Sequence, residues 1–165
     1  DRPLTKEEAL ELGEQKEDIY REMVRQTPAT QQLMPGAPEF LDELKVRGIP
    51  VNIATAAGYG NVRFYFDFFG LERWFDFDTI VYDNGNMNSK PAPDYYLLAA
   101  EKIGVDPKTA VIFEDSHSGL AAAKNAGAKK IIALETGNNR EELASLGIAD
   151  VIVPDYFAPE VRELF

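Results

Sequence analysis

From about residue 36 to the last residue, short apolar stretches alternate with amphipathic segments, and this alternation leaves few folds open to the chain. The apolar stretches predict strands over 51–55, 77–81, 110–113, 130–134 and 150–153. Apolar residues at helical spacing predict helices over 38–47, 60–69, 93–103, 116–126, 139–146 and 159–165. The sequence therefore predicts an α/β fold, a three-layer, Rossmann-like open parallel sheet with helices on both faces.

The first part of the chain contains one long predicted helix and no strand. Thr5 and Glu8 form a capping box at its start, and Thr27 followed by Pro28 ends it. One apolar stripe runs along this helix at helical spacing: Leu12, Ile19, Tyr20, Met23 and Val24.

The composition limits the classes of partner. The 165 residues are 45% hydrophobic, which suits one globular core, and they carry a formal net charge of −11. This charge argues against nucleic acid and against anionic membranes, but a bound metal and one lysine can still attract an anionic substrate. The chain has no cysteine, which excludes disulfides. It shows no signal peptide and no bilayer-spanning apolar run, so we expect it to be cytoplasmic.

Ligands of open parallel sheets bind beyond the carboxyl ends of the strands, so the residues just after each strand matter most. The first predicted strand ends at Thr55, and Ala56 and Ala57 come next. The Thr55 hydroxyl can donate to a phosphoryl oxygen, and the backbone amides of the adjoining turn point the same way. The competing interpretation is that Thr55 only caps the next helix.

A stiff loop presents Lys90. Pro91 and Pro93 restrict this loop, and Asp94 lies in the first turn of the helix after it. A lysine held in this way can neutralise charge on a transferring phosphoryl group. The alternative is an ordinary exposed loop lysine.

Two adjacent carboxylates, Glu114 and Asp115, come after the apolar stretch 110–113, and Ser116 begins the next helix. Mg²⁺ prefers one or two carboxylates together with water and phosphate oxygens, so this pair is a candidate magnesium site. Gly119 lies in the first helical turn, where a side chain could block a close approach. An acidic helix cap is the alternative, but it leaves Glu114 unexplained.

A hydroxyl, a lysine and an acid pair on three successive strand ends together fit metal-assisted phosphoryl transfer with Mg²⁺ as the cofactor. His117, the one histidine of the sequence, lies beside the acid pair. We expect it to be an exposed residue at a helix start and not a catalytic group.

Sequence blocks in this order resemble the haloacid dehalogenase superfamily, and within it the β-phosphoglucomutase-like phosphatases, which have a helical cap inserted after the first strand. The resemblance covers nearly all of the chain from Pro35 onward. It rests on these blocks: Met34-Pro35-Gly36, Ile53-Ala54-Thr55, Lys90-Pro91-Ala92-Pro93-Asp94, Glu114-Asp115-Ser116-His117-Ser118-Gly119 and Ala122-Ala123-Lys124-Asn125-Ala126-Gly127.

The resemblance implies a role for each block. Thr55, with the turn at Ala56 and Ala57, would bind the phosphoryl group, and Lys90 would stabilise both this group and the nucleophile. The metal would be held by Asp115, and by Glu114 directly or through water. Supporting roles would fall to Asp94 and Ser116. Residues 1–33 would be the later part of the cap, and 34–165 the α/β core.

The family's nucleophile block is missing from the sequence. In the family, a first strand ends in an aspartate, a variable residue and a second aspartate, and the first aspartate attacks phosphorus. Asp1 has no strand before it, and Asp76-Phe77-Asp78 precedes a strand instead of coming after one. We therefore expect a segment of a longer protein to supply the nucleophile and the central strand, between the strands that end at Thr55 and at Glu114. The 165 residues alone are expected to be inactive.

The leading prediction is a Mg²⁺-dependent phosphatase or phosphomutase that acts on a small phosphorylated metabolite through an aspartyl-phosphate. One alternative is an inactive or truncated relative that binds phosphate or a partner. Another alternative is a haloacid dehalogenase. Dehalogenation needs no metal, so the candidate magnesium site at Glu114 and Asp115 argues against this alternative.

Overall fold

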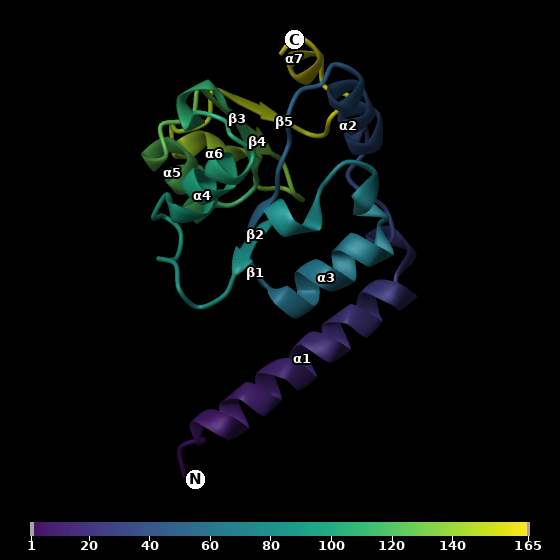
Figure 1. Cartoon of the computed structure of the whole chain (residues 1–165), viewed down its shortest axis with the longest axis vertical. Coiled ribbons are helices and arrows are strands. Elements are labelled where there is room, and N and C mark those ends of the chain that lie inside the picture. The colour runs from purple at the N-terminus through teal and green to yellow at the C-terminus, as the bar shows by residue number, and fades with distance from the viewer. Residues whose placement is uncertain (1, 165) are drawn as a thin grey trace.

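The computed structural model describes residues 2–164, apart from the side chains of residues 6, 9, 10 and 29. It confirms the α/β class with parallel sheets (Figure 1). The helices are α1 (Lys6–Gln26), α2 (Ala37–Val46), α3 (Tyr59–Phe68), α4 (Asp94–Lys102), α5 (His117–Asn125), α6 (Arg140–Ser145) and α7 (Pro159–Arg162). The strands are β1 (Ala54–Gly58), β2 (Val81–Asp83), β3 (Val111–Glu114), β4 (Lys130–Leu134) and β5 (Val151–Val153).

The strands form two separate parallel sheets. One sheet pairs β1 with β2, and the other has the order β3-β4-β5. Within the described part of the chain, no strand pairs with both sheets, so β1 and β3 each have one edge without a neighbouring strand.

The second sheet lies between two layers of helices, which Figure 1 shows to its two sides. Successive side chains of a strand point to opposite faces, and β4 shows this clearly. Ile131 and Ala133 are buried in one cluster with residues of α4, α5 and α6. Ile132, between them, is buried in another cluster with residues of α2 and α7. These are the three layers that the sequence pattern predicts.

Helix α4 joins the two sheets. Its Tyr95 and Ala99 pack against Val81 of β2, whereas its Tyr96 packs in the cluster of β4, α5 and α6. Helix α3 covers the β1-β2 sheet through Val62 and Phe66. The two sheets are therefore linked by this shared helix and by Ala54 of β1, which also packs against the cluster of β4, α5 and α6.

A cavity of about 570 Å³ lies between the two sheets. It is lined on one side by residues 51–54 and on the other by residues 110–113, and α2, α4 and Tyr156 contribute to its walls. Most of these lining side chains are apolar. The cavity therefore adjoins the start of β1, at Ala54, and the unpaired edge of β3.

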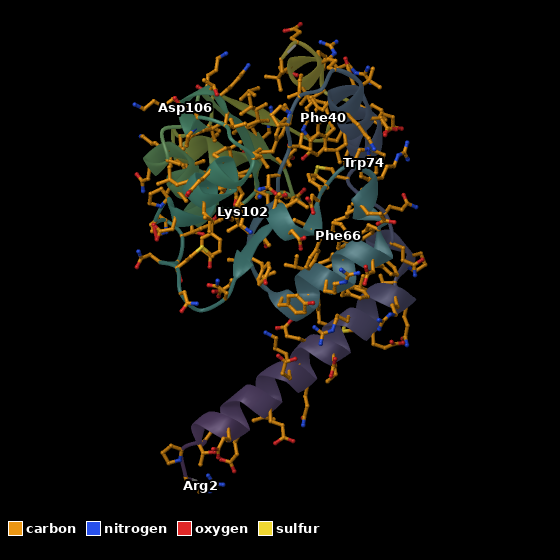
Figure 2. The ribbon with its side chains drawn as sticks, viewed as in Figure 1. Arg2, Phe40, Phe66, Trp74, Lys102 and Asp106 are labelled. Carbon is orange, nitrogen blue, oxygen red and sulfur yellow. The ribbon has the colours of Figure 1, made fainter. Side chains whose placement is uncertain are left out.

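Helix α1 extends away from the rest of the molecule, and Figure 2 shows Arg2 at its far end, well apart from Phe66 on α3. The predicted capping box is present at its start. Of the predicted apolar stripe only Val24 is buried, and Leu12, Ile19, Tyr20 and Met23 are exposed. No described helix combines the length and the apolar character that a membrane span needs.

Two predicted strands differ from the observed ones. The predicted strand 51–55 is replaced by β1, which begins at Ala54 and continues to Gly58. The predicted strand 77–81 begins as a 3₁₀ turn over Phe77–Thr79, and β2 starts only at Val81. The predicted helix 159–165 is shorter, and α7 ends at Arg162.

Candidate active site

Thr55 lies inside β1, near its start, and not at the end of the strand. Its hydroxyl oxygen accepts a hydrogen bond from the Ala57 backbone N–H at 3.1 Å, which leaves the hydroxyl hydrogen free to donate. Gly58 is the N-cap residue of α3, and no side chain caps that helix, so the interpretation of Thr55 as a helix cap is wrong. Ala56 is exposed and Ala57 is half-buried beside the α3 cluster.

Lys90 is not an exposed loop lysine. Its side chain is 10% exposed, and its ammonium group forms an ion pair with the Glu114 carboxylate, whose side chain is 9% exposed. The Lys90 ammonium also donates to the Tyr96 hydroxyl at 2.9 Å. The loop between β2 and α4 and the end of β3 thus meet through a buried charge pair.

Both carboxylate oxygens of Glu114 are engaged. Oε1 accepts from Lys90 and from the Tyr96 hydroxyl at 2.8 Å. Oε2 accepts from the backbone N–H groups of Asp115 and Ser116, each at 2.8 Å, and from the Ser116 hydroxyl at 2.9 Å. Burial disfavours the charged form, but Lys90 and the Ser116 amide outweigh this and hold the pKa of Glu114 below its usual value.

Asp115 has a different environment although it is the next residue. It is exposed, and its backbone N–H donates to Glu114. Partial desolvation, and then the negative charge of Glu114, raise the pKa of the Asp115 carboxyl above its usual value. Of the two adjacent acids, Asp115 is therefore the one whose carboxylate is open to a ligand.

Gly119 and Ser116 make room for the Glu114 carboxylate. Ser116 is the N-cap residue of α5, and its hydroxyl oxygen accepts from the Gly119 N–H at 3.1 Å. A methyl group at Gly119 would lie 1.9 Å from the Glu114 carboxyl carbon. The Glu114 carboxylate therefore occupies the space that a side chain at position 119 would fill. The close approach predicted at Gly119 is thus a contact with Glu114.

Asp94 closes the loop that carries Lys90. One of its carboxylate oxygens accepts from the Asn88 backbone N–H at 3.1 Å and from the Asn88 side-chain amide at 2.7 Å. The Lys90–Pro91 peptide bond is cis. Asn125 at the end of α5 donates to the Pro91 carbonyl at 2.9 Å. These hydrogen bonds thus hold the loop at Asn88, at Pro91 and at its junction with α4.

Tyr96 belongs to this site and was missed by the sequence reasoning. The available signal was its place, on the inner face of the helix that comes after the lysine loop. Its ring centroid lies 4.7 Å from the Lys90 ammonium nitrogen. Tyr156, whose ring stacks on Phe113 of β3, lies nearby, and burial raises its pKa to about 12.

The remaining candidates lie outside this group. His117 is exposed, as expected, and contacts Glu142 of α6 at 3.0 Å. Asp76 and Asp78 precede β2, at the opposite end of the strand from the site, and the Asp76 carboxylate accepts from the Asp78 N–H at 3.0 Å. Asp1 lies outside the described residues.

The blocks that contain Thr55, Lys90 and Glu114 differ in their side-chain contacts with one another. Lys90 and Glu114 are in direct contact. The described hydrogen bond of the Thr55 side chain is to the Ala57 amide, and not to Lys90 or Glu114. The structure therefore joins the lysine and acid blocks directly and the threonine block only through the fold.

Among the described residues of this site, Asp115 is the side chain that best suits a magnesium ion. No group of three or more histidine or acidic side chains in residues 2–164 is arranged to hold a metal. The open Asp115 carboxylate fits an ion that takes one or two carboxylates and completes its shell with water and phosphate oxygens. The Glu114 oxygens, which already accept hydrogen bonds, fit direct ligation less well.

Comparison with known proteins adds the family. The sequence profile of the haloacid dehalogenase-like hydrolases matches residues 2–127. A phosphorylated carbohydrates phosphatase of Thermotoga maritima is 29% identical over 154 residues, which cover 93% of this chain and 67% of that protein. A β-phosphoglucomutase of Mycobacterium bovis is 30% identical over 159 residues, which cover 94% of this chain and 59% of that protein.

A solved structure has the same fold over nearly the whole chain. It is a HAD hydrolase of family IA, variant 3, from Entamoeba histolytica, with a TM-score of 0.86 and 32% sequence identity. The match covers 96% of this chain and 70% of that one. This chain thus spans about 60 to 70% of the length of these three proteins.

Proposed function

Because this chain belongs to the haloacid dehalogenase-like hydrolase family, we propose that it forms most of a Mg²⁺-dependent phosphatase or phosphomutase of a small phosphorylated metabolite. The observation that carries the proposal is the buried Lys90–Glu114 pair beside the open Asp115 carboxylate. A fixed cation next to a free carboxylate suits a site that must hold both a phosphoryl group and a metal. The names of two relatives, a carbohydrate phosphatase and a phosphoglucomutase, support a phosphorylated sugar as the substrate class.

Each residue has a distinct part in this proposal. Lys90 binds the phosphoryl oxygens and offsets their charge, and Thr55 donates its free hydroxyl hydrogen to the same group. Asp115 would hold Mg²⁺, which when bound neutralises charge on the phosphoryl group. Glu114 orients Lys90 and acts on the metal only indirectly, since both of its oxygens are engaged. Residues 1–33 are proposed to be the later part of a helical cap, and 34–165 the α/β core.

The aspartate nucleophile is proposed to come from a strand outside the 165 residues. In the sequence, no aspartate pair of the family's type comes after a predicted strand. The apolar cavity between residues 51–54 and 110–113 supports this, because it adjoins the start of β1 and the unpaired edge of β3, which could pair with an inserted strand. A strand parallel to β1 and β3 would bring its carboxyl end, and an aspartate there, to the side of Asp115 and Lys90.

Hydrolysis of p-nitrophenyl phosphate tests the proposal. The protein that includes the nucleophile segment should hydrolyse this ester only with Mg²⁺, and the 165 residues alone should not. Lys90→Ala should reduce kcat by about 10²–10³-fold, because a fixed donor to the phosphoryl group is lost. Lys124→Ala is the matched control, since Lys124 is an exposed lysine at the end of α5.

Three outcomes would contradict the proposal. Turnover by the 165 residues alone would show that the nucleophile is not where we place it. Full activity of Lys90→Ala would show that Lys90 does not stabilise the phosphoryl group, which the proposal requires. Phosphate binding without hydrolysis, in the protein with its nucleophile segment and Mg²⁺, would favour a binding protein over an enzyme.

A further inference from the structure

Tyr96 connects the two charged groups of the site. It lies on α4 and is 8% exposed. Its hydroxyl accepts a hydrogen bond from the Lys90 ammonium at 2.9 Å and donates one to Glu114 Oε1 at 2.8 Å. Lys90, Tyr96 and Glu114 therefore form a closed triangle, because Lys90 also pairs with the same Glu114 oxygen.

The hydroxyl has a fixed direction in this triangle. A tyrosine hydroxyl has one hydrogen to donate, and here Glu114 accepts it, so only its lone pairs face Lys90. Burial and the neighbouring Glu114 charge raise the pKa of Tyr96, so the hydroxyl keeps its hydrogen at neutral pH. The face of the Tyr96 ring supports the ammonium from a second direction, at 4.7 Å.

The arrangement limits what the Lys90 ammonium can do. An ammonium group has three hydrogens, and in this structure Glu114 and the Tyr96 hydroxyl take two of them. We propose that Tyr96 is a positioning residue whose hydroxyl, together with Glu114, holds the Lys90 ammonium so that its third hydrogen is presented to a phosphoryl oxygen of the substrate. The functional half of this inference rests on the proposed phosphoryl transfer, whereas the placement of Lys90 does not.

Tyr95 provides a matched control on the adjacent position. It is also on α4 and is only 1% exposed, so it is buried even more deeply than Tyr96. Its hydroxyl interacts with Asp83 of β2 and not with Lys90 or Glu114. Tyr95→Phe and Tyr96→Phe each remove one buried hydroxyl from the same helix and keep the ring, so only the second change touches the triangle.

The placement is tested by NMR of ¹⁵N-lysine-labelled protein, in the 165-residue chain itself. The Lys90 ammonium should give a resonance that is protected from exchange with water, assigned by its loss in Lys90→Ala. Tyr96→Phe should shift this resonance and speed its hydrogen exchange about tenfold, because one of the ammonium's acceptors is lost. Tyr95→Phe should leave it unchanged. Because phenylalanine keeps the ring, Tyr96→Phe tests only the hydroxyl. An unaltered Lys90 resonance in this variant would therefore overturn the inference.

The functional half is tested by kinetics in the protein that carries its nucleophile. Tyr96→Phe should lower kcat for p-nitrophenyl phosphate about tenfold and leave KM within about twofold, because the charge of Lys90 remains but its orientation loosens. Tyr95→Phe should retain the wild-type kcat. Equal kcat in Tyr96→Phe and wild type would refute the role in catalysis. If the wild type hydrolyses no phosphate ester, the proposed function fails instead, and the NMR result still decides the placement.

Discussion

At the scale of single residues, Gly119 is a position where the addition of one methyl group should lower stability. A Cβ atom there would lie 1.9 Å from the Glu114 carboxyl carbon, and Glu114 is held by Lys90, Tyr96 and Ser116. Gly119→Ala should therefore lower the free energy of unfolding by about 1–3 kcal/mol, even though alanine favours a helix. Urea denaturation measures this change.

Gly13 is the control for this substitution. It also lies in a helix, α1, but nothing is within 4 Å of a Cβ atom built on it. Gly13→Ala should be neutral or stabilising by up to about 1 kcal/mol, because only the helical preference of alanine acts there. A Gly119→Ala protein that is as stable as Gly13→Ala would mean that the Glu114 carboxylate can move away at little cost.

Glu114 should make stability depend on pH in one direction. Its pKa is lowered in the folded protein by Lys90 and the Ser116 amide against the cost of burial. The stabilisation is therefore complete above the pKa of an unfolded glutamate, about 4.3, and is lost as pH falls from there through the lower folded value. Glu114→Gln should cost about 3–5 kcal/mol at pH 7, because it leaves Lys90 buried without its counter-charge.

The control for the pH experiment is Glu43→Gln. Glu43 pairs with Arg47 at 2.6 Å, but both side chains are 44% exposed, and such pairs contribute little. The difference in unfolding free energy between wild type and Glu114→Gln, measured from about pH 7 to about pH 3, should shrink as pH falls below about 4.3, whereas Glu43→Gln should track wild type throughout. A Glu114→Gln deficit that stays constant over this whole range would show that packing, and not charge, sets its cost.

Sequence reasoning found the reactive residue types but not their pairing. Lys90, Glu114 and Asp115 were predicted from their places near strand ends, and all three lie on that side of the fold. The contact of Lys90 with Glu114 spans 24 positions of sequence, and nothing local in the sequence encodes it. Tyr96 was not predicted for the same reason, since a tyrosine on an inner helix face is more often a core residue.

At the scale of helices and strands, most predicted elements are present, because apolar periodicity determines which face is buried. The two displaced strands have local causes. At residues 51–53, the Asn52 side chain donates to the carbonyls of Thr79 and Ala99 at 2.8 and 3.0 Å and fastens the segment without a strand ladder. Before β2, the Asp76 carboxylate accepts from the Asp78 amide, which favours a turn over an extended backbone.

Helix α1 shows where periodicity misleads. Its stripe is amphipathic, but only its later part contacts the body, where Asn61 of α3 accepts from Arg21 at 2.7 Å and donates to Glu17 at 2.6 Å. Polar contacts and the buried Val24 therefore attach this helix, and most of the apolar stripe remains in solvent. The sequence indicates which face is apolar, but whether anything covers that face depends on neighbours that the periodicity does not specify.

At the scale of the whole molecule, the cavity between β1 and β3 separates the two sheets. The hydrogen bonds from β3 to β4 show which backbone groups of β3 face this cavity. The Ala110 carbonyl accepts from Lys129 and Lys130 at the side of β4. Backbone groups of successive strand residues alternate between the two edges, so those of Val111 and Phe113 are directed to the cavity side. Exposed N–H groups at such an edge are ready to pair with another strand.

Hydrogen exchange of backbone amides can therefore report whether the cavity takes a strand. In the 165 residues alone, the amides of Val111 and Phe113 should exchange at least about 100-fold faster than those of Ile132 and Ala133, because β4 is paired on both edges. An added apolar peptide that ends in the family's two aspartates should slow exchange at Val111 and Phe113 and leave β4 unchanged. The same peptide with a proline at its centre is the control, since proline lacks the N–H that a central strand needs. Equal protection of β3 and β4 without any peptide would mean that the described residues already close this edge, and the nucleophile would then have to approach the site without inserting a strand.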